Sequence, residues 1–191
     1  MLARILLCYL IGSIPTGYIL SKTIYNIDLR FCGSGSTGAT NALRCTKSKS
    51  IGAITLFGDL AKGAVIAYLF KCNPYCFLFC FAGLLGHCYP CWLNFHGGRG
   101  VSMSAGMFFA INPLCATIAV IAWALSLVFI KISAVASLSM SFVFLASVLI
   151  QFFLGITNSK TLVFALCVFL FLVWTHRIHI QNWISGSHNK T

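Results

Sequence analysis

Residues 101–130 read VSMSAGMFFAINPLCATIAVIAWALSLVFI, a stretch of 30 positions without one charged side chain. A helix needs about 20 mostly apolar residues to cross a bilayer, so this stretch is long enough for more than one crossing. Asn112-Pro113 interrupts it, because proline lacks the backbone donor that a continuing helix needs. We therefore expect two shorter spans joined by a tight turn, which places the chain among membrane proteins.

The composition of the whole chain points the same way. Of its 191 residues, 59% are hydrophobic and 8% are charged, whereas a soluble domain is about 45–50% apolar and about 25% charged. Thirteen Lys and Arg stand against two acids, Asp28 and Asp59. These values exclude a soluble fold, a disordered chain and an enzyme that works with paired carboxylates. Such a surplus of cations is expected where the missing anion is a substrate or a lipid headgroup.

Apolar stretches of similar length recur along the chain. The first is too long and too punctuated for a cleaved signal peptide. Together with the two halves of 101–130 they predict seven spans, with five as the alternative if the third and fourth merge or are re-entrant. The fold class is thus all-α, a polytopic transmembrane helical bundle forming a single domain over residues 1–191. The remaining spans are expected at Leu2–Lys22, Ile51–Phe70, Tyr75–Leu93, Ser133–Leu154 and Lys160–Thr175.

The basic residues predict the orientation of these spans. With seven spans, one side of the membrane collects nine basic residues and the other collects three, while Lys62 falls inside the second span. The side richer in Lys and Arg faces the cytoplasm, so we expect the N-terminus outside and the C-terminus cytoplasmic. The cytoplasmic set is Lys22, Arg30, Arg44, Lys47, Lys49, Arg99, Lys131, Arg177 and Lys190, and the outer set is Arg4, Lys71 and Lys160.

Ten cysteines raise the question of disulfides or a metal site. Most lie within the expected spans, where cysteine behaves as a small hydrophobic residue. Cys88 and Cys91, with His87 and His96 nearby, form the one arrangement that resembles zinc ligation, but there is no second Cys-x-x-Cys and Pro90 lies inside the pair. We favour a structural use of the cysteines and expect no metal.

A polar cluster at residues 33–44, GSGSTGATNALR, stands out from its apolar surroundings. Its glycines let backbone N–H groups turn toward an anion, and Arg44 can bind a phosphate through two hydrogen bonds. The cluster lacks the Gly-Lys-Ser/Thr ending of a Walker loop and the strand–helix–strand setting of a dinucleotide site. On the glycines alone, a solvated linker between spans explains it equally well.

Three further polar groups accompany it. Gly97-Gly98-Arg99-Gly100 directly precedes an apolar span and so offers the N–H groups of a helix N-terminus to an anion, although a flexible turn with Arg99 reaching the headgroups is an alternative. His176-Arg177-Ile178-His179 follows the last span, where contact with anionic lipid is the simpler explanation. Asp59 and Lys62 lie one helical turn apart within a span and are expected to neutralise each other. Three phosphate-compatible clusters on one face together predict a cytoplasm-facing anion site.

With YLIGSIPTGY at 9–18, DLAKG at 59–63 and GHCYP at 86–90, these clusters resemble the bacterial acyl-phosphate-dependent glycerol-3-phosphate acyltransferases. The likeness runs nearly end to end and in order. It implies a seven-helix enzyme of the bacterial cytoplasmic (inner) membrane, with its active-site loops facing the cytoplasm. It also implies transfer of an acyl group from acyl phosphate to the sn-1 hydroxyl of glycerol 3-phosphate. That reaction gives lysophosphatidic acid and phosphate, the first acylation step of phospholipid biosynthesis, and uses no cofactor.

The resemblance also assigns roles to residues, with phosphate held by Ser34 and Arg44 and a glycerol-3-phosphate pocket shaped by the later glycines. The implied catalytic residues are Ser34, Arg44, Arg99 and His176. The implied substrate-binding residues are Gly33, Gly35, Ser36, Gly38, Thr40, Asn41, Gly97, Gly98, Gly100 and His179. This chain departs from the family pattern at four positions, where the family has Asn, Lys, Asn and Glu in place of Ser36, Arg99, His179 and His188.

The composition suits this chemistry, because phosphate is a good leaving group and two anionic substrates need cations rather than carboxylates. No histidine has an aspartate five residues later, and no Ser-His-Asp triad can be assembled. We expect positioning and oxyanion stabilisation, with the proton taken by a substrate phosphate or by His176. The expected partners are acyl phosphate, glycerol 3-phosphate and membrane lipid, without nucleic acid or a protein partner. A small transporter or binding protein for a phosphorylated metabolite is the alternative, although no inverted repeat is present.

Overall fold

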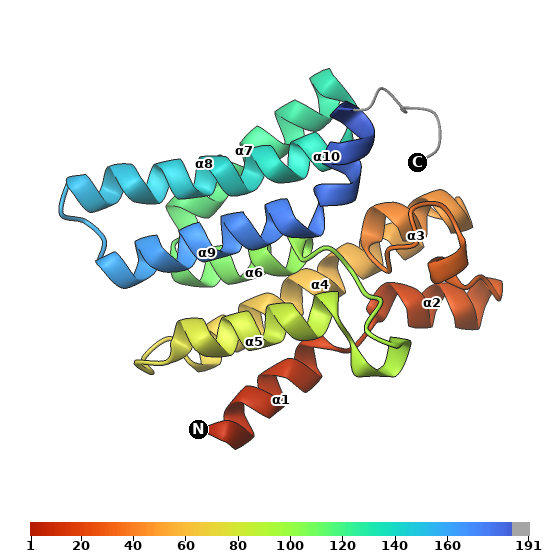
Figure 1. The fold of residues 1–191 in the computed structure, drawn as a ribbon, viewed down its shortest axis with the longest axis horizontal. Coiled ribbons are helices and arrows are strands. Elements are labelled where there is room, and N and C mark those ends of the chain that lie inside the picture. The colour runs from red at the N-terminus through yellow and green to blue at the C-terminus, as the bar shows by residue number, and fades with distance from the viewer. Residues whose placement is uncertain (185–191) are drawn as a thin grey trace. The chain divides into compact units, whose positions relative to one another are not determined.

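A computed structural model describes residues 1–184 of the chain, and all regular structure within that range is helical (Figure 1). Lys190 and His188, which the sequence analysis singled out, lie outside the described residues. The chain divides into two compact units, the first running from Met1 to Ala110 and the second beginning at Ile111. The helical fold class is confirmed for the described residues, and a single domain stays a prediction.

The first unit carries the polar loops of interest. α1 packs against α5, α2 against α3 and α4, and α4 against α3 and α5. Short 3₁₀ turns, η1 and η2, lead into the polar loops. The elements are α1 (Leu2–Gly12), α2 (Thr16–Tyr25), η1 (Leu29–Phe31), α3 (Ala39–Thr46), α4 (Lys49–Leu69), α5 (Cys76–Cys88), η2 (Cys91–Leu93) and α6 (Val101–Ile111).

The first expected span is interrupted between α1 and α2. Pro15 cannot donate a backbone hydrogen bond, so the helix breaks there, and the carbonyl of the preceding residue accepts the N–H of Thr16 at 3.1 Å. The ammonium of Lys62 on α4 donates to that carbonyl, the oxygen of Ile14, at 2.6 Å. A charged side chain inside one span therefore satisfies the broken backbone of another.

Glycines bring the helices of this unit into backbone contact. A Cβ at Gly12 or Gly86 would collide with the backbone of Gly83 or Tyr9, where α1 meets α5. A Cβ at Gly63 would likewise collide with the carbonyl of Met103, where α4 meets α6. Small residues permit such close approach of membrane helices, and here they align the helix ends from which the polar loops emerge.

The second unit comprises α7 (Pro113–Ile130), α8 (Ser133–Phe153), α9 (Ser159–Thr175) and α10 (Arg177–Ile184). α8 packs against both α7 and α9, and Phe144 and Val168 are fully buried among them. The helix break predicted at Asn112-Pro113 is confirmed. Asn112 caps α7 by accepting the N–H of Cys115 at 3.2 Å. Pro113 begins the helix, at a position where a backbone N–H would have no partner within the helix.

Five helical segments in residues 1–184 are long and apolar enough to cross a membrane. They are 2–25, 49–69, 76–93, 113–130 and 133–153. α6 and α9 are apolar but shorter, with 11 and 17 residues. The multi-span character is thus confirmed, whereas a total of seven spans and the orientation of the termini stay predictions.

Candidate functional site

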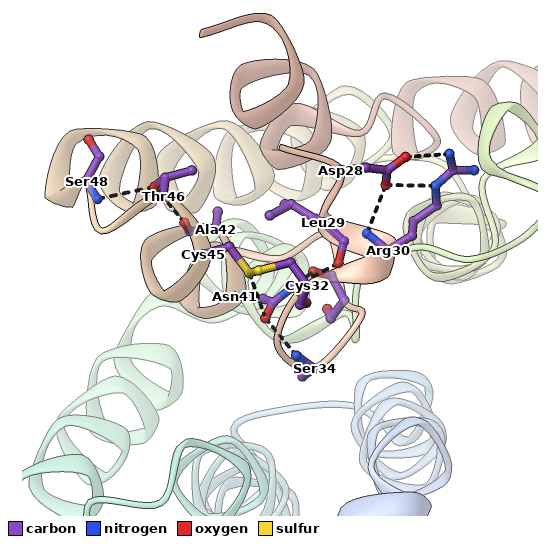
Figure 2. The surroundings of a disulfide bond; sticks show 11 residues. Asp28, Leu29, Arg30, Cys32, Ser34, Asn41, Ala42, Cys45, Thr46 and Ser48 are labelled. Atoms are coloured by element: carbon purple, nitrogen blue, oxygen red, sulfur yellow. Dashed lines mark hydrogen bonds and ion pairs between the residues drawn. A yellow bond between two sulfur atoms is a disulfide. The ribbon is translucent and has the colours of Figure 1, made fainter. Parts of the chain in front are cut away.

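The Gly-Ser loop, residues 33–44, runs from the end of η1 into α3. Gly33 and Gly35 adopt φ values of +59° and +72°, a left-handed conformation that glycine reaches without strain. Upstream of the loop, Asp28 caps η1 by accepting the N–H of Arg30 and also holds the Arg30 side chain through two contacts of 3.0 and 2.7 Å. This ion pair fixes the entrance of the loop (Figure 2).

Asn41 organises the interior of the loop. Its side chain is 3% exposed, and its amide oxygen accepts the N–H of Ser34 at 2.9 Å. Its amide nitrogen donates to the carbonyls of Leu29, Cys32 and Ser36 at 3.3, 3.0 and 2.8 Å. Figure 2 shows the Asn41 side chain next to the Cys32–Cys45 disulfide, with a dashed line to Ser34. Its polar atoms therefore serve the backbone of the loop, which gives Asn41 a positioning role.

The remaining loop residues surround the start of α3. The hydroxyl of Ser36 accepts the N–H of Gly38 at 3.3 Å, and Gly38 directly precedes the helix. Thr40 is exposed in the first helical turn, and Arg44 is exposed in the last turn. Ser34 is partly exposed. The structure thus brings together on one small loop the candidate residues that the sequence placed there.

A disulfide between Cys32 and Cys45 closes this loop, with the two Cα atoms 6.1 Å apart. The sequence analysis expected a structural use of the cysteines but proposed no pair. The two residues are 13 positions apart in the chain, and only the turn through the glycines makes them neighbours. Single-sequence spacing carries no signal of that turn geometry, so the pairing was missed.

The glycine loop, residues 97–100, pairs with the chain that leaves α5. The N–H of Gly97 donates to the carbonyl of Cys88 at 3.1 Å, and the N–H of Gly98 donates to the carbonyl of His87 at 3.0 Å. A Cβ at Gly98 would collide with the His87 ring. The N–H groups of Gly97 and Gly98, which were expected to face an anion, therefore donate to backbone carbonyls instead. These two glycines act by permitting close packing.

Arg99 and the start of α6 supply the donors that this pairing does not use. Gly100 has a φ of +88° and its carbonyl accepts both the N–H and the hydroxyl of Ser104, at 2.8 and 2.7 Å. The first N–H groups of a helix have no partner within the helix and carry a partial positive charge. The loop thus combines a guanidinium with a helix N-terminus.

The two loops meet each other within the first unit. The N–H of Thr37 in the Gly-Ser loop donates to the carbonyl of Gly97 at 3.3 Å. Burial lowers the pKa of Arg99 to about 10, and the positive charge of Arg44 contributes to this lowering. Both acids of the chain are engaged by other cations, Asp28 by Arg30 and Asp59 by Lys62. The contact between loops therefore concentrates positive charge, as a site for a dianionic group requires.

A buried polar cluster lies beneath the glycine loop. The predicted pairing of Asp59 with Lys62 is confirmed by a contact of 2.8 Å. The same carboxylate oxygen lies 3.8 Å from Nδ1 of His87, whose ring packs against Gly98. The cluster therefore links the broken first span, through Lys62, to the loop that carries Arg99. From the sequence, His87 was a weak zinc candidate and part of the GHCYP motif at 86–90, and its contact with Asp59 was not predicted.

The C-terminal histidines belong to the second unit and are described within it. His176 is 2% exposed, and its Nδ1 lies 2.8 Å from the carbonyl of Leu172. Since a carbonyl only accepts, Nδ1 carries the proton and the basic lone pair of the neutral ring is on Nε2. The ring of His179 lies 6.5 Å from that of His176, and Arg177 lies over the ring of Trp174.

No group of three or more His, Cys, Asp or Glu side chains that could hold a metal occurs among the residues that the structure describes. Cys88 is buried while Cys91 is exposed.

The family model described as glycerol-3-phosphate acyltransferase matches residues 2–186 of the chain. The chain belongs to this glycerol-3-phosphate acyltransferase family. The resemblance recognised in the sequence motifs is confirmed. The protein is an integral membrane acyltransferase of glycerol 3-phosphate, an activity of lipid biosynthesis.

Curated relatives of the acyltransferase extend along nearly its whole length. A glycerol-3-phosphate acyltransferase of Pelagibacter ubique is 35% identical over 185 residues, which cover 96% of this chain and 93% of the relative. One of Listeria welshimeri is 36% identical over 191 residues, with 97% and 93% covered.

Two crystal structures of PlsY (YgiH), an integral membrane glycerol 3-phosphate acyltransferase, resemble the fold. The glycerol 3-phosphate form aligns with a TM-score of 0.87 at 28% identity, covering 100% of this chain and 94% of that one. The lysophosphatidic acid form aligns with a TM-score of 0.84 at 26% identity, covering 99% and 94%. These PlsY forms carry the substrate and the product of a glycerol 3-phosphate acylation.

Proposed function

We propose that the acyltransferase uses acyl phosphate as its donor and acylates the sn-1 hydroxyl of glycerol 3-phosphate, releasing lysophosphatidic acid and phosphate. The observation that carries the proposal is the contact between the Gly-Ser loop and the glycine loop. Across this contact the positive charge of Arg44 contributes to the lowered pKa of Arg99. Two cations held near each other, while the carboxylates bind other residues, suit two phosphate-bearing substrates. In a thioester donor the acyl carbonyl is bonded to sulfur, so no phosphate would lie beside the reacting carbonyl.

In this mechanism the protein positions the substrates and stabilises charge. Arg44 and the backbone around Ser34 bind the phosphate of glycerol 3-phosphate, in a pocket that the glycines at 97, 98 and 100 help to shape. Arg99 and the first turn of α6 bind the acyl phosphate. The hydroxyl attacks the acyl carbonyl, the same cations stabilise the oxyanion, and inorganic phosphate leaves. A substrate phosphate takes the hydroxyl proton.

The other implied residues act on the shape of the site. Gly33, Gly35 and Gly38 let the Gly-Ser loop turn, and Ser36 and Asn41 brace it through the bonds described above. Gly97, Gly98 and Gly100 allow the glycine loop to pack closely, and Thr40 contributes to the polar lining. Ser34 binds substrate and is not acylated in this proposal.

The decisive experiment supplies the purified protein in detergent with palmitoyl phosphate and radiolabelled glycerol 3-phosphate, and measures lysophosphatidic acid. Arg44→Ala is expected to raise the KM for glycerol 3-phosphate at least tenfold, since a charge-assisted contact to phosphate is lost. Lys49→Ala, an exposed cation at the start of the neighbouring α4, is the matched control and keeps the wild-type KM. Product formation from palmitoyl-coenzyme A but not from palmitoyl phosphate contradicts the donor. A stable acyl-Ser34 enzyme trapped during turnover contradicts the direct mechanism.

The same proposal includes seven spans, an outer N-terminus and loops that face the cytoplasm of a bacterial inner membrane. The nine basic residues against three support this orientation. It predicts that a cytoplasm-active reporter fused after Thr191 is active, whereas a reporter fused before Met1 is active only when it functions outside the cytoplasmic membrane. The reverse pattern, or both ends on one side, contradicts the orientation and the count of seven.

A further inference from the structure

The Cys32–Cys45 disulfide spans the proposed substrate loop and nothing else. Cys32 directly precedes Gly33, and Cys45 directly follows Arg44, so the bond joins the residues on either side of the whole Gly-Ser loop. Both cysteines are partly exposed, whereas five of the eight free cysteines are buried. A small thiol reagent therefore has access to this bond.

The bond also contacts the residue that would bind phosphate. A Cβ placed on Gly33 would lie 3.3 Å from Cδ of Arg44 and 3.3 Å from the sulfur of Cys45. The stem of Arg44 thus runs along Gly33 next to the disulfide (the Cys32–Cys45 bond is drawn in yellow in Figure 2). Opening the bond leaves Arg44 and Cys45 within α3 but releases the Cys45 sulfur from its fixed place beside Gly33 and the stem of Arg44.

Asn41 holds the loop independently of the disulfide, so loss of the bond need not unfold it. Asn41 makes hydrogen bonds with backbone groups of Ser34, Leu29, Cys32 and Ser36, and these do not require the disulfide. Its amide oxygen also lies 3.8 Å from the sulfur of Cys45. Asn41 therefore secures the first half of the loop, α3 secures the backbone of the second half, and the disulfide joins the two halves covalently. This division predicts a loop that stays folded on reduction but positions Arg44 less firmly.

The proposed orientation places this bond on the cytoplasmic side, where thiols are kept reduced and disulfides are mostly transient, catalytic or sensing. We propose that Cys32 and Cys45 form a reversible thiol–disulfide pair that adjusts the affinity of the Gly-Ser loop for glycerol 3-phosphate. The disulfide form binds the substrate more tightly, because it holds Arg44 in place before binding. This inference rests on the proposed role of the loop in phosphate binding.

The chemistry is thiol–disulfide exchange. A dithiol reductant breaks the Cys32–Cys45 bond and forms a disulfide within itself, so that two electrons and two protons pass to the two cysteine sulfurs. In the opposite direction a low-molecular-weight disulfide such as oxidised glutathione accepts the two electrons. It is released as two thiol molecules while the Cys32–Cys45 bond forms.

The test compares one preparation before and after treatment with dithiothreitol. The state of the pair is read by alkylation and peptide mass spectrometry, and the KM for glycerol 3-phosphate is measured together with kcat. We expect reduction to raise the KM about threefold to tenfold, the range expected when a pre-organised side chain becomes mobile, with little change in kcat. Oxidised glutathione is expected to restore the low KM.

The Cys32→Ser, Cys45→Ser double variant is expected to show the high KM and no response to dithiothreitol. Cys72→Ser, which removes an exposed cysteine on the turn between α4 and α5, keeps the wild-type response. An unchanged KM in protein shown by mass spectrometry to be fully reduced overturns the inference, as does the absence of a Cys32–Cys45 peptide after oxidation. Failure of the proposed loop function is distinguishable, because Arg44→Ala would then leave the KM unchanged in both redox states.

Discussion

The side-chain oxygen of Asn41 lies 2.9 Å from the backbone nitrogen of Ser34, seven positions earlier in the chain. This bond fixes the direction of Ser34 within a loop whose glycines would otherwise allow many conformations. Because the amide nitrogen of Asn41 also donates to three backbone carbonyls, one buried side chain determines the shape of half of the Gly-Ser loop.

Asn41→Ala is therefore expected to impair substrate binding without removing any group that would touch substrate. Leaving buried backbone groups unsatisfied costs about 1–3 kcal/mol for each fully desolvated group, so we expect a loss of about 2–4 kcal/mol in the free energy of unfolding. The KM for glycerol 3-phosphate should rise more than tenfold. Thermal unfolding in detergent and steady-state kinetics measure the two effects.

Asn73→Ala provides the matched control for that change. Asn73 lies in the turn between α4 and α5, where its side chain accepts a single N–H, that of Tyr75. Its loss should cost about 1 kcal/mol at most and leave the KM unchanged. An Asn41→Ala enzyme with wild-type KM would show that the loop does not need this brace.

Gly98 and His87 provide a second test, because a Cβ at Gly98 would collide with the His87 ring. Gly98→Ala is expected to destabilise the protein by about 1–3 kcal/mol through overpacking and to displace the neighbouring Arg99, raising the KM for acyl phosphate. The cost should shrink when His87→Ala is introduced as well, since the smaller side chain leaves room for the added methyl group. A double-mutant cycle followed by thermal unfolding measures this coupling. Strictly additive effects would mean that the two residues do not meet.

The pKa of Arg99 predicts how the stability of the enzyme and its KM for acyl phosphate change at alkaline pH. Its pKa is lowered to about 10 by burial and by the charge of Arg44. Since the folded protein releases this proton at a lower pH than the unfolded chain does, the contribution of Arg99 to stability rises with pH above about 10. Binding of a phosphate has the opposite sign, because the anion requires the charged form. The KM for acyl phosphate should therefore increase as the pH approaches 10.

Arg99→Lys is the matched variant for this pH dependence. A lysine ordinarily titrates at about 10.4, well below arginine, so the same burial should bring its titration closer to neutral pH. The alkaline rise in KM should consequently begin at a lower pH in Arg99→Lys than in the wild type. Identical pH profiles for the two enzymes would mean that this position does not bind the anion in its charged form.

The sequence predicted the parts of this molecule that depend on local pattern. The apolar stretches located the helices, the Asn112-Pro113 pair located the break before α7, and the spacing of Asp59 and Lys62 located their ion pair. Each of these follows from neighbouring residues on one helix or turn. The Gly-Ser loop and the glycine loop were likewise recognisable from their own residues.

The contacts between distant segments could not be predicted in this way. The N–H groups of Gly97 and Gly98 looked available to an anion, yet they donate to Cys88 and His87, which lie on a different element. Asn41 looked like a substrate ligand, whereas its amide is used by the backbone of its own loop. Such partners depend on how the chain folds back on itself, and hydrophobic periodicity does not encode that.

The buried ion pair of Asp59 and Lys62 gives a last test, because the charge of each residue neutralises that of the other. Lys62 also donates to the carbonyl of Ile14, and Asp59 also faces His87. Replacing one partner leaves the other charge buried, which costs about 3–5 kcal/mol. Asp59→Leu and Lys62→Met are each expected to lower the yield of folded protein and its unfolding temperature in detergent. The double variant should recover part of the loss, because it leaves no unpaired charge, although the Ile14 carbonyl loses the ammonium of Lys62 and keeps only the N–H of Thr16. Comparing the three variants by thermal unfolding decides the matter, and a double variant as unstable as the sum of the singles would exclude mutual compensation.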